Sequence, residues 1–180
     1  MPDTELQSAG LERLLARAAI HDVQMRYCRG IDRCDVDLIR SAYWPDGVDH
    51  HGIFDGNAVE FADFVVTHLR RSLRSAHMVS NMSVAFQSQD DAEVETYVLS
   101  YAERPGDEGS SESLQGGRYL DRFNRRGEEW RILERTYVMD WNMNGPSTAQ
   151  WEGRLYGRLS LRGGRWPDDP AYALIPGLFG

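Results

Sequence analysis

Hydrophobic residues recur at helical spacing in the first part of the chain. Ile20, Val23, Tyr27 and Ile31 lie on one face if residues 11–31 form a helix, in one piece or in two. A helix with one apolar stripe has to bury that stripe against another element. We therefore expect this face to pack into the core of the domain.

Turn-forming and capping residues divide the segment that follows. Gly30 lies near the end of this helix, and a short second helix, preceded by Asp35, is expected over residues 37–43. Proline and glycine both break helices, so residues 44–47 are expected to form a turn. A short strand over residues 48–54 is expected next.

The remaining pattern changes from helical to alternating. Asn57 and Glu60, three positions apart, form a capping-box signature that predicts a helix to about residue 71. Long β-like segments are then predicted at residues 75–87, 93–104, 114–125 and 129–141. Because the connections between them are of hairpin length, we expect an antiparallel meander rather than the alternating strands and helices of a nucleotide-binding fold.

The order of elements, helices first and sheet second, predicts the fold class α+β. The N-terminal helices would pack into a strongly curved antiparallel sheet, which wraps around them as a cone and leaves a pocket at its wide end. We find no repeat and no domain linker, so residues 1–180 are expected to form one domain. Residues 146–180, with weak periodicity, are expected to form a C-terminal extension that covers the pocket or a neighbouring subunit.

Composition narrows the classes of partner and chemistry. A net charge of −8 argues against nucleic acid or an anionic membrane as a partner, since both bind basic surfaces. All 20 basic residues are arginine, which excludes Schiff-base chemistry on a lysine. We expect a cytoplasmic protein, because signal-peptide and membrane-spanning patterns are missing. Cys28 and Cys34 lack the spacing of a redox pair or a zinc site and are expected to be buried thiols.

Three residues could carry chemistry, and each also has an ordinary structural explanation. Asp32 could cap the short helix, His77 could bond a backbone carbonyl, and Tyr27 could belong to the core. Strand alternation places His77 and Val79 on one face of the strand and Met82 on the other. Either face could be the inner one. A carboxylate beside a histidine fixes the imidazole tautomer and raises its proton affinity. An Asp32–His77 pair could therefore act as a general base.

Several short segments together resemble the SnoaL-like proteins of the NTF2-like superfamily. They are Ala-Ala-Ile-His-Asp at 18–22, Tyr27, Gly-Ile-Asp-Arg-Cys-Asp at 30–35, and the segments 44–52, 75–77, 116–123 and 130–135. They occur in the order of the family, and the resemblance covers roughly residues 8–145. It implies the same cone fold that the element order predicts.

The resemblance also implies roles for individual residues. The group includes bile-acid dehydratases, scytalone dehydratase, a hexachlorocyclohexane dehydrochlorinase and lyases that release formaldehyde from lignin-derived diaryl compounds. In these enzymes a helix-borne Asp orients a strand-borne His, which acts as the base. The matching residues here are Asp32 and His77. Tyr27 matches a tyrosine that polarises the substrate, and Arg135 matches a pocket arginine.

Other polar and aromatic residues are candidates for binding a substrate. A metal site could be considered at Asp49, His50 and His51. Adjacent strand residues point to opposite faces, however, so only one of the two histidines can face the pocket and we expect no metal site. His51 shares a face with Asp49 and is expected to line the pocket. The aromatic residues expected to offer flat surfaces to a ligand are Tyr43, Trp44, Tyr101, Tyr119 and Trp141.

The residues and the resemblance together predict a lyase that needs no cofactor. It would eliminate water or formaldehyde from a hydrophobic, aromatic, hydroxylated small molecule by acid–base catalysis. The alternatives are an isomerase or cyclase that uses the same pair, and a non-catalytic small subunit or binding protein, because fold alone proves no activity. Apolar residues near the end of the chain, including Tyr172 and Phe179, predict a homo-oligomer, either a trimer or a dimer.

Overall fold

A computed structural model describes residues 2–107 and 109–178, so Phe179 lies outside the described residues. Its first helix, α1 (Pro2–Arg33), is continuous. The expected start at residue 11 and the alternative of two separate helices are therefore wrong. Gly30 does not end this helix. A Cβ at Gly30 would lie 2.8 Å from the backbone nitrogen of Ile39 in α2 (Val36–Ser41). The glycine therefore permits a close contact between two helices.

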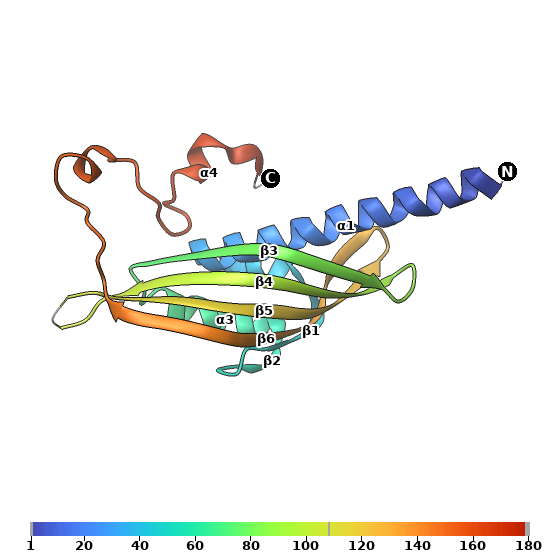
Figure 1. Ribbon diagram of the computed structural model, residues 1–180, viewed down its shortest axis with the longest axis horizontal. Helices are drawn as coiled ribbons and strands as arrows, with labels where there is room; N and C mark the ends of the chain where they lie inside the picture. Colours follow the sequence, from blue (N-terminus) through green and yellow to red (C-terminus); the bar gives the residue numbers. More distant parts are fainter. Residues whose placement is uncertain (1, 108, 179–180) are drawn as a thin grey trace.

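The helices pack against a six-stranded sheet with the strand order β2-β1-β6-β5-β4-β3 (Figure 1). The strands are β1 (Tyr43–His50), β2 (Asp55–Asn57), β3 (Arg74–Phe86), β4 (Asp91–Arg104), β5 (Ser111–Arg126) and β6 (Glu129–Pro146). Strands β3 to β6 form the predicted antiparallel meander. Strand β1 joins β6 in parallel, so the sheet is mixed rather than wholly antiparallel. The α+β fold with helices packed into a curved sheet is confirmed.

Strand β1 occupies positions where a turn was expected. Tyr43 and Val48 both pair with β6, and the register shifts between them, so the proline and glycine at 44–47 lie in an irregular stretch of the strand. The turn comes later instead. The backbone N–H of His51 donates to the carbonyl of Phe54 at 2.9 Å, which ends the expected strand at residue 50.

Helix α3 (Ala58–Leu69) begins as the sequence predicts. The side chain of Asn57 accepts a hydrogen bond from the backbone N–H of Val59 at 2.8 Å, which satisfies one of the free donors of the first turn. Phe61 and Ala62 of this helix are buried against the sheet. Helix α3 therefore closes the core on the side of β1 and β2.

An irregularity in β3 changes which side chains face the core. Val79 pairs with Val98 and Met82 pairs with Thr96, so the register shifts between them. The extra residue reverses the alternation, and His77, Val79 and Met82 all face inwards. The sequence had placed His77 and Met82 on opposite faces, because strict alternation takes no account of a bulge.

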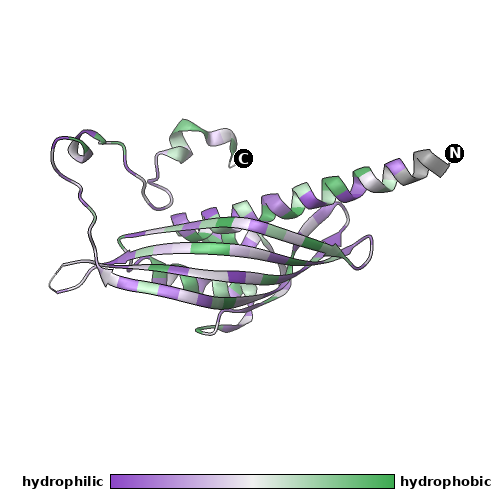
Figure 2. Cartoon of the chain, in the orientation of Figure 1, coloured by the Kyte–Doolittle hydropathy of each residue, from purple (hydrophilic) through white to green (hydrophobic). Residues whose placement is uncertain are grey.

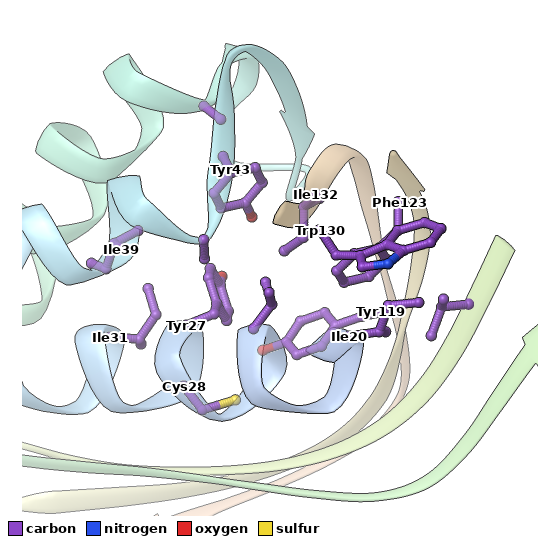
Figure 3. Packing of buried hydrophobic residues seen from close by; sticks show 14 of the residues in the cluster. Ile20, Tyr27, Cys28, Ile31, Ile39, Tyr43, Tyr119, Phe123, Trp130 and Ile132 are labelled. Atoms are coloured by element: carbon purple, nitrogen blue, oxygen red, sulfur yellow. The ribbon is translucent and has the colours of Figure 1, made fainter. Parts of the chain in front are cut away.

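The core lies between the helices and the inner face of the sheet (Figure 3). Ile20, Val23, Tyr27 and Ile31 are each at most 3% exposed, which confirms the predicted apolar face of α1. Hydrophobic and hydrophilic residues alternate along the strands (Figure 2). The free thiols of the chain are buried, as expected. Within the described residues, no helix is long and apolar enough to cross a membrane.

The chain beyond β6 turns back towards the carboxyl end of α1 (Figure 1). It contains the short helical turns η1 (Tyr156–Arg158), α4 (Ala171–Leu174) and η2 (Pro176–Leu178). The backbone N–H of Trp166 donates to the carbonyl of Arg33 at 2.6 Å, and the hydroxyl of Tyr172 donates to Asp35 at 2.9 Å. We call residues 147–178 the C-terminal extension.

Glu103 in β4 joins this extension to the sheet. Its buried carboxylate accepts hydrogen bonds from Arg74 at 2.5 Å, from Ser110 at 2.7 Å and from Ser147 at 3.2 Å. The Ser110 hydroxyl lowers the pKa of Glu103, burial acts in the opposite sense, and Arg74 lowers it further, so the result is a lowered pKa. The folded protein therefore favours the ionised carboxylate.

This lowered pKa predicts a pH-dependent stability. The contribution of Glu103 is fully present above the ordinary pKa of a glutamate, about 4.3, and is lost as the pH falls through the lower folded-state value. Replacing Glu103→Gln should therefore flatten the decline of the free energy of unfolding at acidic pH. Urea unfolding between pH 7 and pH 3 measures this, with Glu12→Gln on the exposed face of α1 as the control. Parallel curves for wild type and Glu103→Gln would contradict the assignment.

Candidate active site

The end of α1 determines where Asp32 points. The backbone N–H of Asp35 donates to the carbonyl of Gly30 at 2.9 Å, and that of Cys34 donates to Ile31 at 3.2 Å. Cys34 has a φ of 53°, in the left-handed region. These are the bonds of a Schellman motif, in which a left-handed residue ends the helix. Asp32 therefore lies in the last turn of α1, next to a sharp change in chain direction.

Asp32 does not cap the following helix. That role belongs to Asp35, whose side chain accepts a hydrogen bond from the backbone N–H of Leu38 at 3.1 Å. The carboxylate of Asp32 binds His77 instead, through both of its oxygens. Oδ1 lies 2.7 Å from the imidazole Nδ1, and Oδ2 accepts the backbone N–H of His77 at 2.9 Å.

The pair has the geometry of a supported base. Strand β3 is an edge strand, so a backbone N–H that points away from β4 needs a partner outside the sheet, and Asp32 supplies it. The other carboxylate oxygen, Oδ1, accepts a hydrogen bond from Nδ1–H, which leaves Nε2 as the acceptor. The side chains of His77 and Asp32 are 15% and 12% exposed, so the pair is shielded from bulk solvent but not sealed.

A second histidine–aspartate pair lies on the other side of the core. Nδ1 of His51 is 2.5 Å from Oδ1 of Asp49, and the hydroxyl of Tyr43 donates to Oδ2 of Asp49 at 2.6 Å. The His51 ring stacks on Phe61 and on Tyr137, with interplanar angles of 19° and 14°. Hydrogen bonding and stacking together hold the imidazole in one orientation. Its side chain is 15% exposed, as is that of His77.

Arg135 forms a charged network inside the core. Its guanidinium donates to both oxygens of Asp121 at 2.7 Å and to the amide oxygen of Gln24 at 2.5 Å. Burial alone would lower the pKa of Arg135, but the Asp121 carboxylate raises it well above the ordinary value. Within the described part of the chain, Nη1 is buried and has no hydrogen-bond partner. A buried donor of this kind requires a physical explanation.

Tyr27 and Tyr119 enclose this cation. The guanidinium carbon of Arg135 lies 4.2 Å from the ring centroid of Tyr27 and 4.0 Å from that of Tyr119. Tyr27 also makes edge contacts with Tyr43 and Tyr119 (Figure 3). Burial raises the pKa of all three phenols, so each keeps its proton. Tyr27 is 1% exposed and Arg135 is fully buried, which places both behind the surface that a ligand would meet.

Three predicted binding residues lie elsewhere. Trp44 donates its indole N–H to the carbonyl of Asn124 at 2.9 Å and is covered by arginine side chains. Tyr101 follows the residue that pairs with His77, so it points to the opposite face of the sheet. Trp141 pairs with Gly116 on that same outer face and is 46% exposed. The structure does not bring these three residues to the Asp32–His77 pair.

Sequence reasoning missed two partners of Arg135. Asp121 lies two positions after Tyr119 on the same face of β5, and Gln24 lies one helical turn before Tyr27 on α1. Both are fully or almost fully buried. Strand and helix periods alone could have found them, because each shares the face of a predicted site residue. Among the described residues, no three His, Cys, Asp or Glu side chains are grouped so that they could hold a metal ion.

Comparison with known proteins identifies the family. Residues 12–136 match the SnoaL-like domain, and the chain belongs to this family. A type 2 hexachlorocyclohexane dehydrochlorinase, LinA, has a similar structure, with a TM-score of 0.71 and 21% identity over 81% of this chain and 99% of that chain. The type 3 LinA of Novosphingobium barchaimii LL02 gives a TM-score of 0.69 and 23% identity over 81% of this chain and 99% of that chain.

A scytalone dehydratase-like protein of Novosphingobium aromaticivorans DSM 12444 gives a TM-score of 0.64 and 15% identity. The match covers 77% of this chain and 92% of that chain. No curated protein sequence matches the chain. At these identities the structural likeness establishes the fold and specifies no reaction.

The buried Arg135–Asp121 pair leads to a stability prediction. Removing one partner leaves the other charge buried without compensation, so Arg135→Met should lower the free energy of unfolding by about 3–5 kcal/mol. The double variant Arg135→Met with Asp121→Leu should lose less than Arg135→Met alone, because no unpaired charge remains. Urea unfolding of the four proteins of this cycle measures both effects. A cost below about 1 kcal/mol for Arg135→Met would contradict the assignment.

Proposed function

We propose that the protein is a cofactor-independent lyase that eliminates water or formaldehyde from a hydrophobic, aromatic, hydroxylated small molecule. The observation that carries the proposal is the 2.7 Å bond between Nδ1 of His77 and Asp32. It leaves Nε2 free to accept a proton, and the carboxylate stabilises the imidazolium that forms. Positioned general bases of this type contribute about 10²–10⁴-fold to a rate.

Two routes use the same base. In a dehydration, Nε2 of His77 takes a proton from carbon, the C–O bond on the neighbouring carbon breaks, and the imidazolium returns its proton to the departing oxygen. In a retro-aldol-like cleavage, Nε2 takes the hydroxyl proton of a hydroxymethyl group, the C–C bond breaks and formaldehyde leaves. The conjugated remainder holds the electron pair until the imidazolium returns the proton to its carbon. Neither route requires a redox cofactor.

The charged network of the core supports the second half of either reaction. Nη1 of Arg135 is a buried donor with no partner among the described residues, and the guanidinium carbon to which it is bonded lies 4.2 and 4.0 Å from the ring centroids of Tyr27 and Tyr119. A preorganised donor in a region of low dielectric constant stabilises charge that develops on oxygen. Tyr27 keeps its proton, so it would act as a donor rather than as a base. Because Tyr27 is 1% exposed and Arg135 is fully buried, a substrate would reach either residue only through displacement of neighbouring side chains.

The surroundings of His51 favour an aromatic substrate. Phe54, Phe61 and Phe64 form a chain of ring contacts with centroid separations of 5.6 and 5.2 Å, and His51 stacks on Phe61 at 4.8 Å. Flat apolar surfaces with a few fixed polar groups are typical of sites for aromatic ligands. His51 would be the fixed polar group of this wall, since Asp49 determines its tautomer.

Turnover of hydroxylated aromatic compounds tests the proposal. Wild-type protein with excess chelator should release water or formaldehyde from a member of such a panel, detected by product mass and by formaldehyde assay. His77→Gln and Asp32→Asn should each lose about 10²–10⁴-fold in kcat/KM, because each removes the supported base. His21→Ala is the matched control, since His21 is an exposed histidine 3.6 Å from Asp22 on α1.

The outcomes separate the alternatives. Conversion without loss of a fragment would identify an isomerase or cyclase. Binding without turnover of any compound would favour a non-catalytic binding protein. Full activity of His77→Gln on a confirmed substrate would refute the base assignment.

A further inference from the structure

Arg165 in the C-terminal extension binds the backbone around the Asp32–His77 pair. Its Nη1 donates to the carbonyl of Asp32 at 2.5 Å and to the hydroxyl of Ser75 at 2.7 Å. Its Nη2 donates to the carbonyls of Leu69 and Ser72 at 3.4 and 3.3 Å. One guanidinium therefore contacts the end of α1, the segment after α3 and the start of β3.

These contacts fall on the backbone that carries the pair. The carbonyl of Asp32 belongs to the last turn of α1, where helix carbonyls lack partners within the helix. Ser75 stands two residues before His77 on β3, and Leu69 is the last residue of α3. The direction of the Asp32 side chain depends on the backbone that Arg165 binds. So does the position of the edge strand that presents His77.

Further bonds hold Arg165 in place. The backbone N–H of Trp166 donates to the carbonyl of Arg33 at 2.6 Å, and the guanidinium of Arg33 donates back to the carbonyl of Gly164 at 3.1 Å. The backbone N–H of Gly164 donates to the buried carboxylate of Asp169 at 2.9 Å. The extension is thus bound on both sides of Arg165.

We propose that Arg165 is a positioning residue for the Asp32–His77 pair, so that the C-terminal extension, outside the SnoaL-like domain at residues 12–136, completes the active site. Its planar fork of donors bridges several carbonyls at fixed angles, which the single ammonium of a lysine cannot do. Arg165 does not touch the imidazole. It acts through the backbone of Asp32 and through Ser75. The catalytic meaning of this role depends on the proposed function, whereas its structural part does not.

Amide hydrogen exchange tests the structural part without a substrate. The backbone N–H of His77 donates to Oδ2 of Asp32, so its exchange rate reports whether the two residues are held together. In Arg165→Met this amide should exchange about tenfold faster or more. The amide of Ile132, which donates to the carbonyl of Ala42 at 2.9 Å and lies away from the extension, should keep its wild-type rate.

Two further variants sharpen the experiment. Arg162→Met is the matched control, because Arg162 donates to carbonyls of Leu159 and Trp151 within the extension, and it should leave the His77 amide unchanged. Arg165→Lys keeps the positive charge, and it replaces Arg165→Met in the experiment if Arg165→Met does not fold. It should also accelerate exchange at His77, by less than Arg165→Met does.

Three results would overturn the proposal. One is wild-type exchange at His77 in Arg165→Met, or in Arg165→Lys if only that variant folds. Another is an equal acceleration at His77 and Ile132, which would mean that Arg165 stabilises the whole fold. The third is the same acceleration in Arg162→Met. Because exchange needs no turnover, failure of the lyase proposal would leave this result unaffected.

Discussion

The two-oxygen contact between Asp32 and His77 is the interaction on which the proposed chemistry depends. One carboxylate oxygen of Asp32 accepts a hydrogen bond from the imidazole Nδ1 of His77, and the other accepts one from the backbone N–H of His77. The backbone bond joins the edge strand to the end of α1, and the imidazole bond determines which ring nitrogen remains free. A carboxylate with only the side-chain bond would orient the ring less firmly. The Schellman end of α1 and the edge position of β3 are both required to bring these groups together.

The fold positions two supported histidines around a core that contains a full charge. Arg135 is surrounded by Asp121, Gln24 and two tyrosine rings, so its charge is compensated by hydrogen bonds rather than by solvent. Such a network stabilises the fold only while every partner is present, because a buried charge without compensation is costly. The unpartnered Nη1 departs from that rule and makes the network a candidate for binding oxygen on a ligand.

Local signals in the sequence predicted much of the fold. The cap at Asn57, the apolar face of α1 and the meander of long strands depend on neighbouring residues and could be derived directly. The parallel pairing of β1 with β6 could not, because it joins segments far apart in the chain through an irregular stretch. The bulge between Val79 and Met82 gives no local signal, so strict alternation misplaced one half of β3.

The residues of the candidate site likewise fall into those that could be predicted from the sequence and those that could not. The roles of Asp32 and His77 followed from the resemblance to SnoaL-like proteins, whereas the shared face of Asp49 and His51 followed from strand alternation. Tyr101 and Trp141 were placed in the pocket from their chemistry alone, whereas strand register places them on the outer face. No local sequence pattern indicates the role of Arg165, because that role depends on how the C-terminal extension returns to the end of α1.

The tautomer of His77 tests the central claim most directly. Long-range ¹H–¹⁵N NMR on histidine-labelled protein distinguishes the two ring nitrogens of the neutral imidazole, and His77→Gln assigns the signal. If Asp32 holds the ring as described, Nδ1 carries the proton and Nε2 is unprotonated. A neutral His77 with its proton on Nε2 would contradict the account, since no free base would face the substrate.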